Sequence, residues 1–199
     1  MGVSELNIHL FRKINDLGKE YTYLNPSFVI ITEYMVIFLA LSVVYFWFTR
    51  TENNRMMIIS ASFAFILAEI IGKTAGKFHS NLQPFAELSS VNQLIDKAIN
   101  NSFPSDHTIL FFSFCVSFML FKKKASFLWI LLAMLVGLSR IWVGVHYPFD
   151  VLVGALVGSI SAVLSYILIQ RVKLFNKLLE IYEKVEKNLL PVKEKSKDL

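Results

Sequence analysis

Three ionisable residues stand close together in a stretch that joins two long apolar segments. Arg140, His146 and Asp150 lie within residues 139–150, and the segments on either side are each long enough to cross a bilayer. Ionisable side chains are costly at a membrane boundary unless they serve a site. Pro148 fits the first turn of a helix, which puts His146 just ahead of that helix and Asp150 in its first turn. The spacing therefore predicts a reactive site around His146.

These residue types suit phosphoryl chemistry. Asp150 is expected to accept a hydrogen bond from one ring nitrogen of His146, which fixes the tautomer and leaves the other nitrogen as a nucleophile. The guanidinium group of Arg140 has the forked donor geometry that phosphate oxygens favour. Taken alone, the three residues could instead form a network that only locks the helix ends.

A second polar group precedes another apolar segment. Ser105 is a natural N-cap, and the amide groups of a helix start bind anions. His107, beside these amides, could donate a proton to a leaving oxygen. The alternative is a helix cap with a histidine in the membrane interface.

A third group ends an earlier apolar segment. Lys73 and Lys77 are four residues apart and share a helix face, and Glu69 could pair with Lys73. His79 and Gln83 follow. The alternative for the two lysines is that they extend from the end of a span into the interface.

The composition shows what kind of scaffold carries these groups. Of the 199 residues, 55% are hydrophobic and the mean hydropathy is +0.54, which indicates an integral membrane protein of one domain, residues 1–199. A single cysteine, Cys115, excludes an intrachain disulfide. The net charge of +5 does not indicate nucleic-acid binding, because the basic residues flank the apolar runs.

We therefore expect an all-α bundle of about five transmembrane helices, at residues 26–48, 56–76, 105–121, 127–145 and 148–169. Residues 1–25 carry apolar positions at helical spacing, which predicts an amphipathic interfacial helix, although a partner-binding helix would look the same. A further amphipathic helix is expected around residues 91–99. In the basic tail, 171–199, a helix along the headgroups and a plain solvated tail both remain open, and the final ten residues are expected to be disordered.

Basic residues predict the orientation. With five spans, the basic connections all fall on one side of the membrane, which the positive-inside rule assigns to the cytoplasm. They are Arg50 and Arg55, the lysines at 122–124 and the basic tail. Residues 77–104 and 139–150 then face outward with the N-terminal segment, although the basic residues of that segment partly favour the inside. All three polar groups therefore converge on the outer face.

The order of these groups resembles the type 2 phosphatidic acid phosphatase superfamily of membrane lipid phosphatases. Ser139, Arg140, His146 and Asp150 match the third family motif, and Pro-Ser-x-His at residues 104–107 matches the second, with an aspartate in place of the usual glycine. The first motif, Lys-x6-Arg-Pro, matches less well.

In that first motif Gln83-Pro84 stands where the family has Arg-Pro, and Lys77 is one residue too near. One fixed positive charge is therefore missing. Lys73 and His79 are open candidates to replace it.

Within the superfamily, the chain most resembles the bacitracin-resistance type of undecaprenyl-diphosphatase, both in its five expected spans and in the sequence of residues 142–148. The resemblance implies a hydrolase that converts undecaprenyl diphosphate to undecaprenyl phosphate, recycles the cell-wall lipid carrier and confers bacitracin resistance. It implies His146 as the nucleophile that becomes a phosphohistidine, Asp150 as its orienting group and His107 as the general acid. The implied phosphate ligands are Arg140, Ser105, Lys77, Ser139 and Gln83.

The same resemblance implies no metal or cofactor, and a multi-pass protein of the bacterial cell membrane with its site facing outside. The expected partners are a polyprenyl diphosphate and membrane lipids, with no nucleic acid. A phosphatase for phosphatidylglycerophosphate or phosphatidate is the first alternative. A lipid or anion transporter is the second, and it predicts ionisable residues deep within the spans. The oligomeric state is left open.

Overall fold

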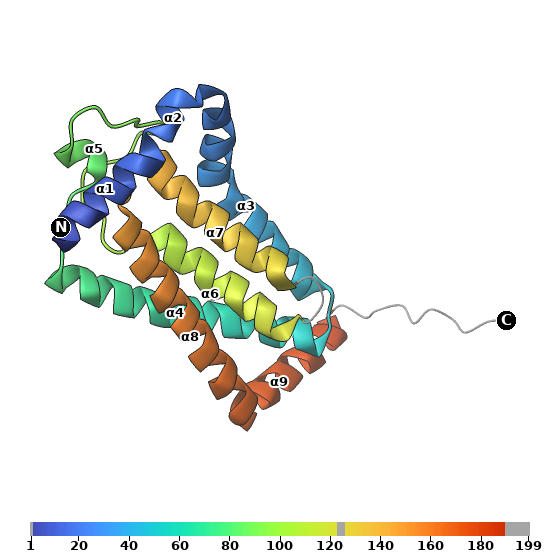
Figure 1. The fold of residues 1–199 in the computed structure, drawn as a ribbon. Helices are drawn as coiled ribbons and strands as arrows, with labels where there is room; N and C mark the ends of the chain where they lie inside the picture. The colour runs from blue at the N-terminus through green and yellow to red at the C-terminus, as the bar shows by residue number, and fades with distance from the viewer. Residues whose placement is uncertain (1, 123–125, 190–199) are drawn as a thin grey trace.

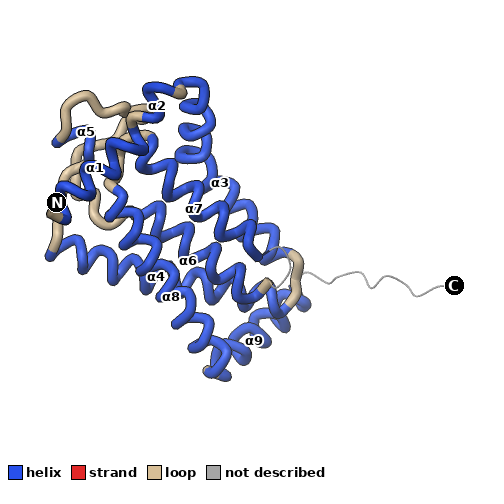
Figure 2. The backbone as a smooth tube through the Cα atoms, in the orientation of Figure 1, coloured by secondary structure: helices blue, strands red, loops and turns tan. Residues whose placement is uncertain are grey.

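Five apolar helices run side by side through the protein, whose computed structural model describes residues 2–122 and 126–189. They are α3 (Asn25–Phe48), α4 (Glu52–Phe78), α6 (Asp106–Phe121), α7 (Ser126–Trp142) and α8 (Pro148–Arg171), shown in Figure 1. No strand occurs in the described residues (Figure 2). The segment 22–48, α4 and α8 are long and apolar enough to cross a membrane, and α6 and α7 are shorter apolar helices. The prediction of an all-α membrane bundle is confirmed.

Local sequence signals explain where several helices begin. Thr51 caps α4, because its side-chain oxygen accepts a hydrogen bond from the amide of Asn54 at 3.3 Å. Prolines stand in the first turns of α3 and α8, where a missing N–H costs nothing. Ser105 occupies the N-cap position of α6, as predicted.

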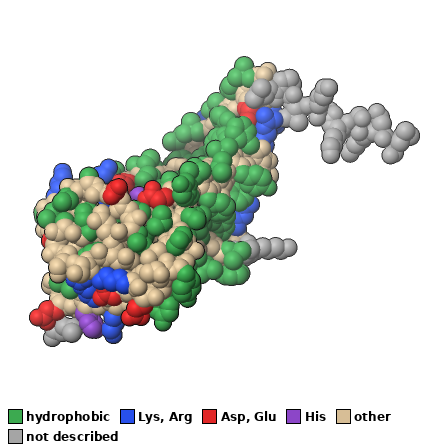
Figure 3. Space-filling model, turned by 90° about the horizontal axis from the view of Figure 1, so that it is seen from above, with side chains coloured by type: hydrophobic (Ala, Val, Ile, Leu, Met, Phe, Trp, Pro, Cys, Tyr) green, Lys and Arg blue, Asp and Glu red, His purple; other side chains and the backbone are tan. Residues whose placement is uncertain are grey.

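α6 lies at the centre of the bundle and packs against α4, α7 and α8. Gly154 and Gly158 allow α8 to approach α6 closely, because a Cβ at either position would lie 2.9 Å from the carbonyl oxygen of Ser105 or Ile109. Phe111 and Phe118 of α6 fill the core together with Met57 and Ala133. Figure 3 shows hydrophobic side chains covering the flank of the molecule, as lipid contact requires.

Four short helices and a long irregular segment cover one end of the bundle (Figure 1). They are α1 (Val3–Asn15), α2 (Leu17–Glu20), η1 (Thr22–Leu24) and α5 (Pro84–Glu87). The predicted N-terminal helix is confirmed as a helix, and its Phe11 is buried against Tyr147 with ring centroids 5.5 Å apart.

The helix predicted around residues 91–99 is wrong, because that segment is irregular. Besides one short-range bond from the amide of Gln93 to the carbonyl of Val91, its backbone groups bond to distant parts of the chain. The side chain of Asn15 bonds to both the N–H and the C=O of Asn92, and the amide of Leu94 donates to the carbonyl of Val143 at 3.2 Å. These distant partners replace the hydrogen bonds of a helix.

The opposite end carries α9 (Lys173–Leu189), which turns back beneath the bundle (Figure 1). Arg55 of α4 is buried there between Glu183 and Glu186 of α9, at 3.0 and 2.5 Å. The tail is helical as far as Leu189, and four of its apolar side chains are 51–56% exposed: Leu174, Leu178, Ile181 and Val185. Lys123 and Lys124 and the tail residues predicted to be disordered, 190–199, lie outside the described residues.

The connections alternate as the sequence predicted. Arg50, Arg55 and Lys122 lie at the end that carries α9, whereas residues 79–105 and 143–147 meet at the other end. The three polar groups of the sequence therefore do converge on one end of the bundle.

Candidate active site

A tight turn between α7 and α8 presents His146. Gly144 adopts a left-handed conformation with φ +86°, and the amides of Val145 and His146 both donate to the carbonyl of Arg140, at 3.2 and 3.3 Å. A Cβ on Gly144 would approach Val91 Cγ1 to 2.8 Å. The turn therefore requires glycine here, both for its conformation and for its contact with the irregular segment.

The imidazole ring of His146 is buried and held from both sides. Its Nδ1 donates a hydrogen bond to the carbonyl of Ser102 at 2.9 Å, and its Nε2 lies 2.9 Å from Nζ of Lys97. A carbonyl can only accept, so Nδ1 carries the hydrogen and Nε2 carries the lone pair. The ring is thus fixed in the tautomer that a nucleophilic Nε2 requires.

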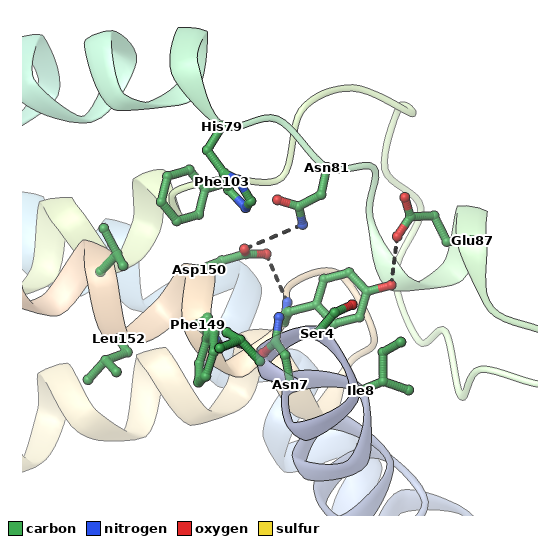
Figure 4. A pocket seen from close by; sticks show the side chains of 13 residues that line it. Ser4, Asn7, Ile8, His79, Asn81, Glu87, Phe103, Phe149, Asp150 and Leu152 are labelled. Carbon is green, nitrogen blue, oxygen red and sulfur yellow. Dashed lines mark hydrogen bonds between the residues drawn. The ribbon is translucent and has the colours of Figure 1, made fainter. Parts of the chain in front are cut away.

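Asp150 does not form the hydrogen bond to His146 that the sequence predicted. Its Oδ2 lies 3.6 Å from Nδ1, because that oxygen already accepts from the hydroxyl of Ser102 at 2.8 Å and from the amide of Tyr147 at 2.9 Å. The other carboxylate oxygen lies 3.5 Å from the amide nitrogen of Asn81 (Figure 4). Asp150 can therefore influence the ring in two ways. Its negative charge lies close to the ring, and it holds the hydroxyl of Ser102, whose carbonyl oxygen accepts the hydrogen bond from Nδ1–H.

Burial lowers the pKa of His146 to about 4. The positive charges of Lys97 and Arg140 act in the same direction, and Asp150 opposes them. The ring is therefore neutral at physiological pH, which keeps its lone pair available.

Arg140 places a buried positive charge in the last turn of α7. Its side chain is 3% exposed, and its Nε donates to none of the residues that the structure describes. A buried guanidinium without a partner is costly, and its forked donors match the oxygens of a phosphate. The arrangement is suited to an anion beside His146.

The start of α6 faces the same region. The amide of Ser105 donates to the carbonyl of Asp150 at 3.1 Å, and the buried Ser105 hydroxyl accepts from the hydroxyl of Thr108 at 3.0 Å. That hydroxyl does not cap the backbone, in contrast to the prediction. His107 lies in the first turn of α6, two residues after Ser105. Direct contacts thus bring Ser105, Asp150, His146 and Arg140 together, and His107 stands at the helix start next to them.

Three predicted phosphate ligands have other surroundings. Lys77 lines a hollow at the end of α4 together with Lys73, and Gln83 is bonded within the irregular segment. The hydroxyl of Ser139 donates to the carbonyl of Val136 in its own helix, at 2.7 Å. The roles of Lys77, Gln83 and Ser139 as phosphate ligands stay predictions.

The two candidates for the missing charge also lie elsewhere. Lys73 pairs with Glu69 at 3.4 Å, as its spacing suggested. The ring of His79 packs edge-on against Phe103, with centroids 4.8 Å apart. No contact joins either residue to His146 among those that the described residues make.

The sequence did not single out Lys97, Ser102 or Asn81. Each lies on the irregular segments that follow α4, and each reaches the site through contacts with residues far away in the chain. The one available signal was their position on the face where the other polar groups converge.

A cavity of about 580 Å³ opens beside Asp150 (Figure 4). Asn7 and Ile8 of α1 form one wall, and Phe103 and Leu152 contribute apolar surface. The described residues that line it include Asp150 but not His146. The cavity therefore lies next to the carboxylate and not in front of the nucleophile.

A buried histidine and a buried arginine at one end of a helical membrane bundle suit the chemistry of an integral membrane phosphatase. The chain belongs to the PAP2 superfamily, whose family model matches residues 57–174. It is 54% identical over 198 residues to the "Bacitracin transport permease protein BcrC" of Bacillus licheniformis, covering 100% of this chain and 98% of that protein.

Two further relatives agree with this placement. The chain is 32% identical to "Undecaprenyl-diphosphatase BcrC" of Bacillus subtilis (strain 168), over 78% of this chain and 79% of that protein. The crystal structure of Aquifex aeolicus LpxE superposes with a TM-score of 0.68 at 29% identity, covering 81% of this chain and 94% of that one. The predicted superfamily is confirmed, and the protein is a hydrolase.

Proposed function

We propose that this protein hydrolyses undecaprenyl diphosphate to undecaprenyl phosphate and inorganic phosphate at the outer face of the bacterial membrane. It thereby recycles the cell-wall lipid carrier and confers resistance to bacitracin. The observation that carries the proposal is the buried His146, whose Nδ1–H donates to the carbonyl of Ser102 while Nε2 keeps its lone pair, 2.9 Å from Nζ of Lys97. The name of the Bacillus subtilis relative supports the diphosphate substrate.

In the first step, Nε2 of His146 attacks the terminal phosphorus in line, and the bond from that phosphorus to the bridging oxygen breaks. The bridging oxygen leaves with undecaprenyl phosphate and takes a proton from His107. Arg140 and the amides at the start of α6 stabilise the oxygens of the transferring group. The product bound to the protein is a phosphohistidine.

In the second step, water attacks the phosphorus and the phosphorus–nitrogen bond breaks. His107, now without its proton, takes one from the water, and His146 regains its lone pair. The charge of Asp150 stabilises the imidazole while it carries the phosphoryl group. Inorganic phosphate then leaves, and both histidines have returned to their starting forms.

A transporter is the competing function, and one relative carries the name of a permease. The distribution of charge favours hydrolysis. Arg140, His107 and His146 gather at one end of the bundle, and the buried Arg55 at the opposite end is paired with Glu183 and Glu186 of α9, so these groups mark no path through the bundle. Phosphate release by the purified protein separates the two functions.

The test compares phosphate release in detergent from undecaprenyl diphosphate, phosphatidylglycerophosphate and phosphatidate, with and without EDTA. We expect the diphosphate to be preferred and EDTA to have no effect. His146→Ala should abolish release while the protein still folds and inserts. Near-normal turnover by this variant would contradict the assignment of the nucleophile, and loss of activity in EDTA would indicate a metal-dependent site.

The orientation has its own test. Cys115 is fully buried, so single cysteines can be introduced against a silent background. Ser89→Cys, on the end that carries the site, should react with a membrane-impermeant maleimide in intact cells. Asn53→Cys, at the opposite end, should react only after lysis. The reverse pattern would place the site on the cytoplasmic face.

A further inference from the structure

Gln83 stands where the family pattern has an arginine, and its side chain is occupied by its own segment. It is fully buried, and its Nε2 donates to the carbonyl of Ala98 at 3.3 Å and to Oδ1 of Asn100. Its Oε1 accepts from the amide of Asn100 at 3.0 Å. Both polar atoms of its side chain are therefore used to hold residues 98–100.

Lys97 directly precedes the residues that Gln83 holds. On its other side, Asn92 is bonded to Asn15 of α1, and the amide of Leu94 donates to the carbonyl of Val143. The segment is thus fixed at two points, one on each side of the lysine. Fixation on both sides restricts the directions in which a long flexible side chain can extend.

The ammonium group of Lys97 points inward to the nucleophile. Its Nζ lies 2.9 Å from Nε2 of His146, whereas the neighbouring Asp96 and Ala98 are exposed. Burial and the positive charge of Arg140 together lower the pKa of Lys97 to about 8. Two cations in one half-buried space repel each other, and a shared anion would relieve that cost.

We propose that Lys97 is a phosphate-binding residue of this site, and that Gln83 is the positioning residue that holds its segment in place. A lysine from the irregular segment then supplies the charge that the family takes from the arginine before the proline. When the substrate enters, Lys97 transfers its hydrogen bond from Nε2 to an oxygen of the terminal phosphate, which frees the lone pair for attack. This inference rests on the proposed phosphatase function.

The first test replaces the charge and keeps the length. Lys97→Met should lower kcat/KM by about 10²-fold, the usual effect of losing one donor to a developing charge. Lys97→Arg should stay within about tenfold of the wild type, because the cation remains. Lys13→Met, an exposed lysine of α1 at the same end, serves as the matched control and should not change kcat/KM. The proposal is overturned if Lys97→Met stays within threefold of the wild type, or if Lys97→Arg loses as much.

The pH profile separates binding from a structural role. Nζ of Lys97 lies against His146, the charges of Arg140, Asp106 and Asp150 act on its pKa, and it binds phosphate only when protonated. Since kcat/KM reports the free enzyme, the loss of the His107 proton lowers it in both proteins, and the wild type should show an additional fall as pH rises through about 8 that is absent from Lys97→Arg. Identical pH profiles of the two proteins would overturn the assignment.

Gln83→Leu removes the hydrogen bonds to residues 98–100 and leaves Lys97 in the chain. Lys97 should then regain water, so the basic limb of kcat/KM should move up towards the ordinary lysine pKa of about 10.4 while kcat/KM falls. A loss of activity with the limb unmoved, or no change in either, would refute the positioning role of Gln83.

A binding assay keeps this inference separate from the identity of the lipid. Inorganic phosphate should raise the unfolding temperature of the wild type, Lys97→Arg and Lys13→Met, and have little effect on Lys97→Met. If the wild type hydrolyses none of the three lipids yet shows this pattern, the proposed function fails and the role of Lys97 stands. If the wild type is active and phosphate stabilises Lys97→Met equally, the role of Lys97 fails and the function stands.

Discussion

Replacing Asp150 by asparagine removes one negative charge beside His146 and keeps the shape of the side chain. Attack by Nε2 puts positive charge on the imidazole, and Asp150 Oδ2 is 3.6 Å from Nδ1. At an effective dielectric constant of about 20, two unit charges at this distance attract by about 4.6 kcal/mol. That energy corresponds to roughly 2 × 10³-fold in rate as an upper limit. We expect kcat to fall by between about 10²- and 10³-fold.

The loss should stay below the roughly 10⁴-fold that accompanies a wrong tautomer in serine proteases. Here the carbonyl of Ser102, and not the carboxylate, receives the proton of Nδ1, so Asp150→Asn leaves the tautomer intact. Ser102→Ala is the matched control. It removes the hydroxyl that donates to Asp150 at 2.8 Å, but keeps both the carbonyl and the charge, and its effect on kcat should be smaller.

The assay is phosphate release from undecaprenyl diphosphate at saturating substrate, with the unfolding temperature measured for each variant. A loss of less than tenfold in Asp150→Asn would show that its charge does not stabilise the imidazole. A loss beyond about 10⁴-fold in a folded protein would show that Asp150 fixes the tautomer, and the role given to Ser102 would then be wrong.

Three further outcomes follow from the same structure. His107→Ala should lower kcat by about 10²- to 10⁴-fold, and the loss should shrink with para-nitrophenyl phosphate, whose leaving group needs less help from an acid; an equal loss with both substrates would contradict a general acid. Burial lowers the pKa of His146, so the ring stays neutral down to about pH 4, and kcat/KM should not fall between pH 7 and 5 through protonation of this ring. A fall in kcat/KM with an apparent pKa near 6.5 would show that burial does not lower the pKa of His146. Arg55→Met should destabilise the protein by about 3 kcal/mol, since it strands Glu183 and Glu186, and should leave kcat unchanged at low temperature; an unchanged unfolding temperature would show that these pairs contribute little.

The bundle could be predicted from the sequence because each span carries its own signal. The sequence predicts the first span at residues 26–48, and α3 begins one residue earlier and ends at Phe48. Apolar length, flanking charges and helix-starting prolines are local properties, and a bilayer leaves helices as the way to satisfy the backbone. The same locality explains why the turn from Arg140 to Asp150 was found, since its members are close in sequence.

The rest of the site depends on contacts between distant residues. Residues 91–99 have an apolar pattern that suits a helix, but Asn15 and Val143 bind their backbone, and Gln83 binds the residues that follow Lys97. Nothing in the spacing of the segment reveals these partners. Asp150 likewise exchanged its expected contact with His146 for one with Ser102, which lies 48 positions away. Tertiary hydrogen bonds decide such segments, and a local pattern does not encode them.

The hydrogen bonds from Gln83 to residues 98–100 also affect how relatives should be compared. If the cation has moved along the chain while keeping its place in space, the arginine before the proline and the lysine at position 97 are alternatives. Relatives with glutamine at the first position should then carry a basic residue in the segment that follows. Relatives with arginine should vary freely there. A relative that lacks the arginine would then still be an active phosphatase. A position-by-position alignment would wrongly suggest that it has lost a site residue.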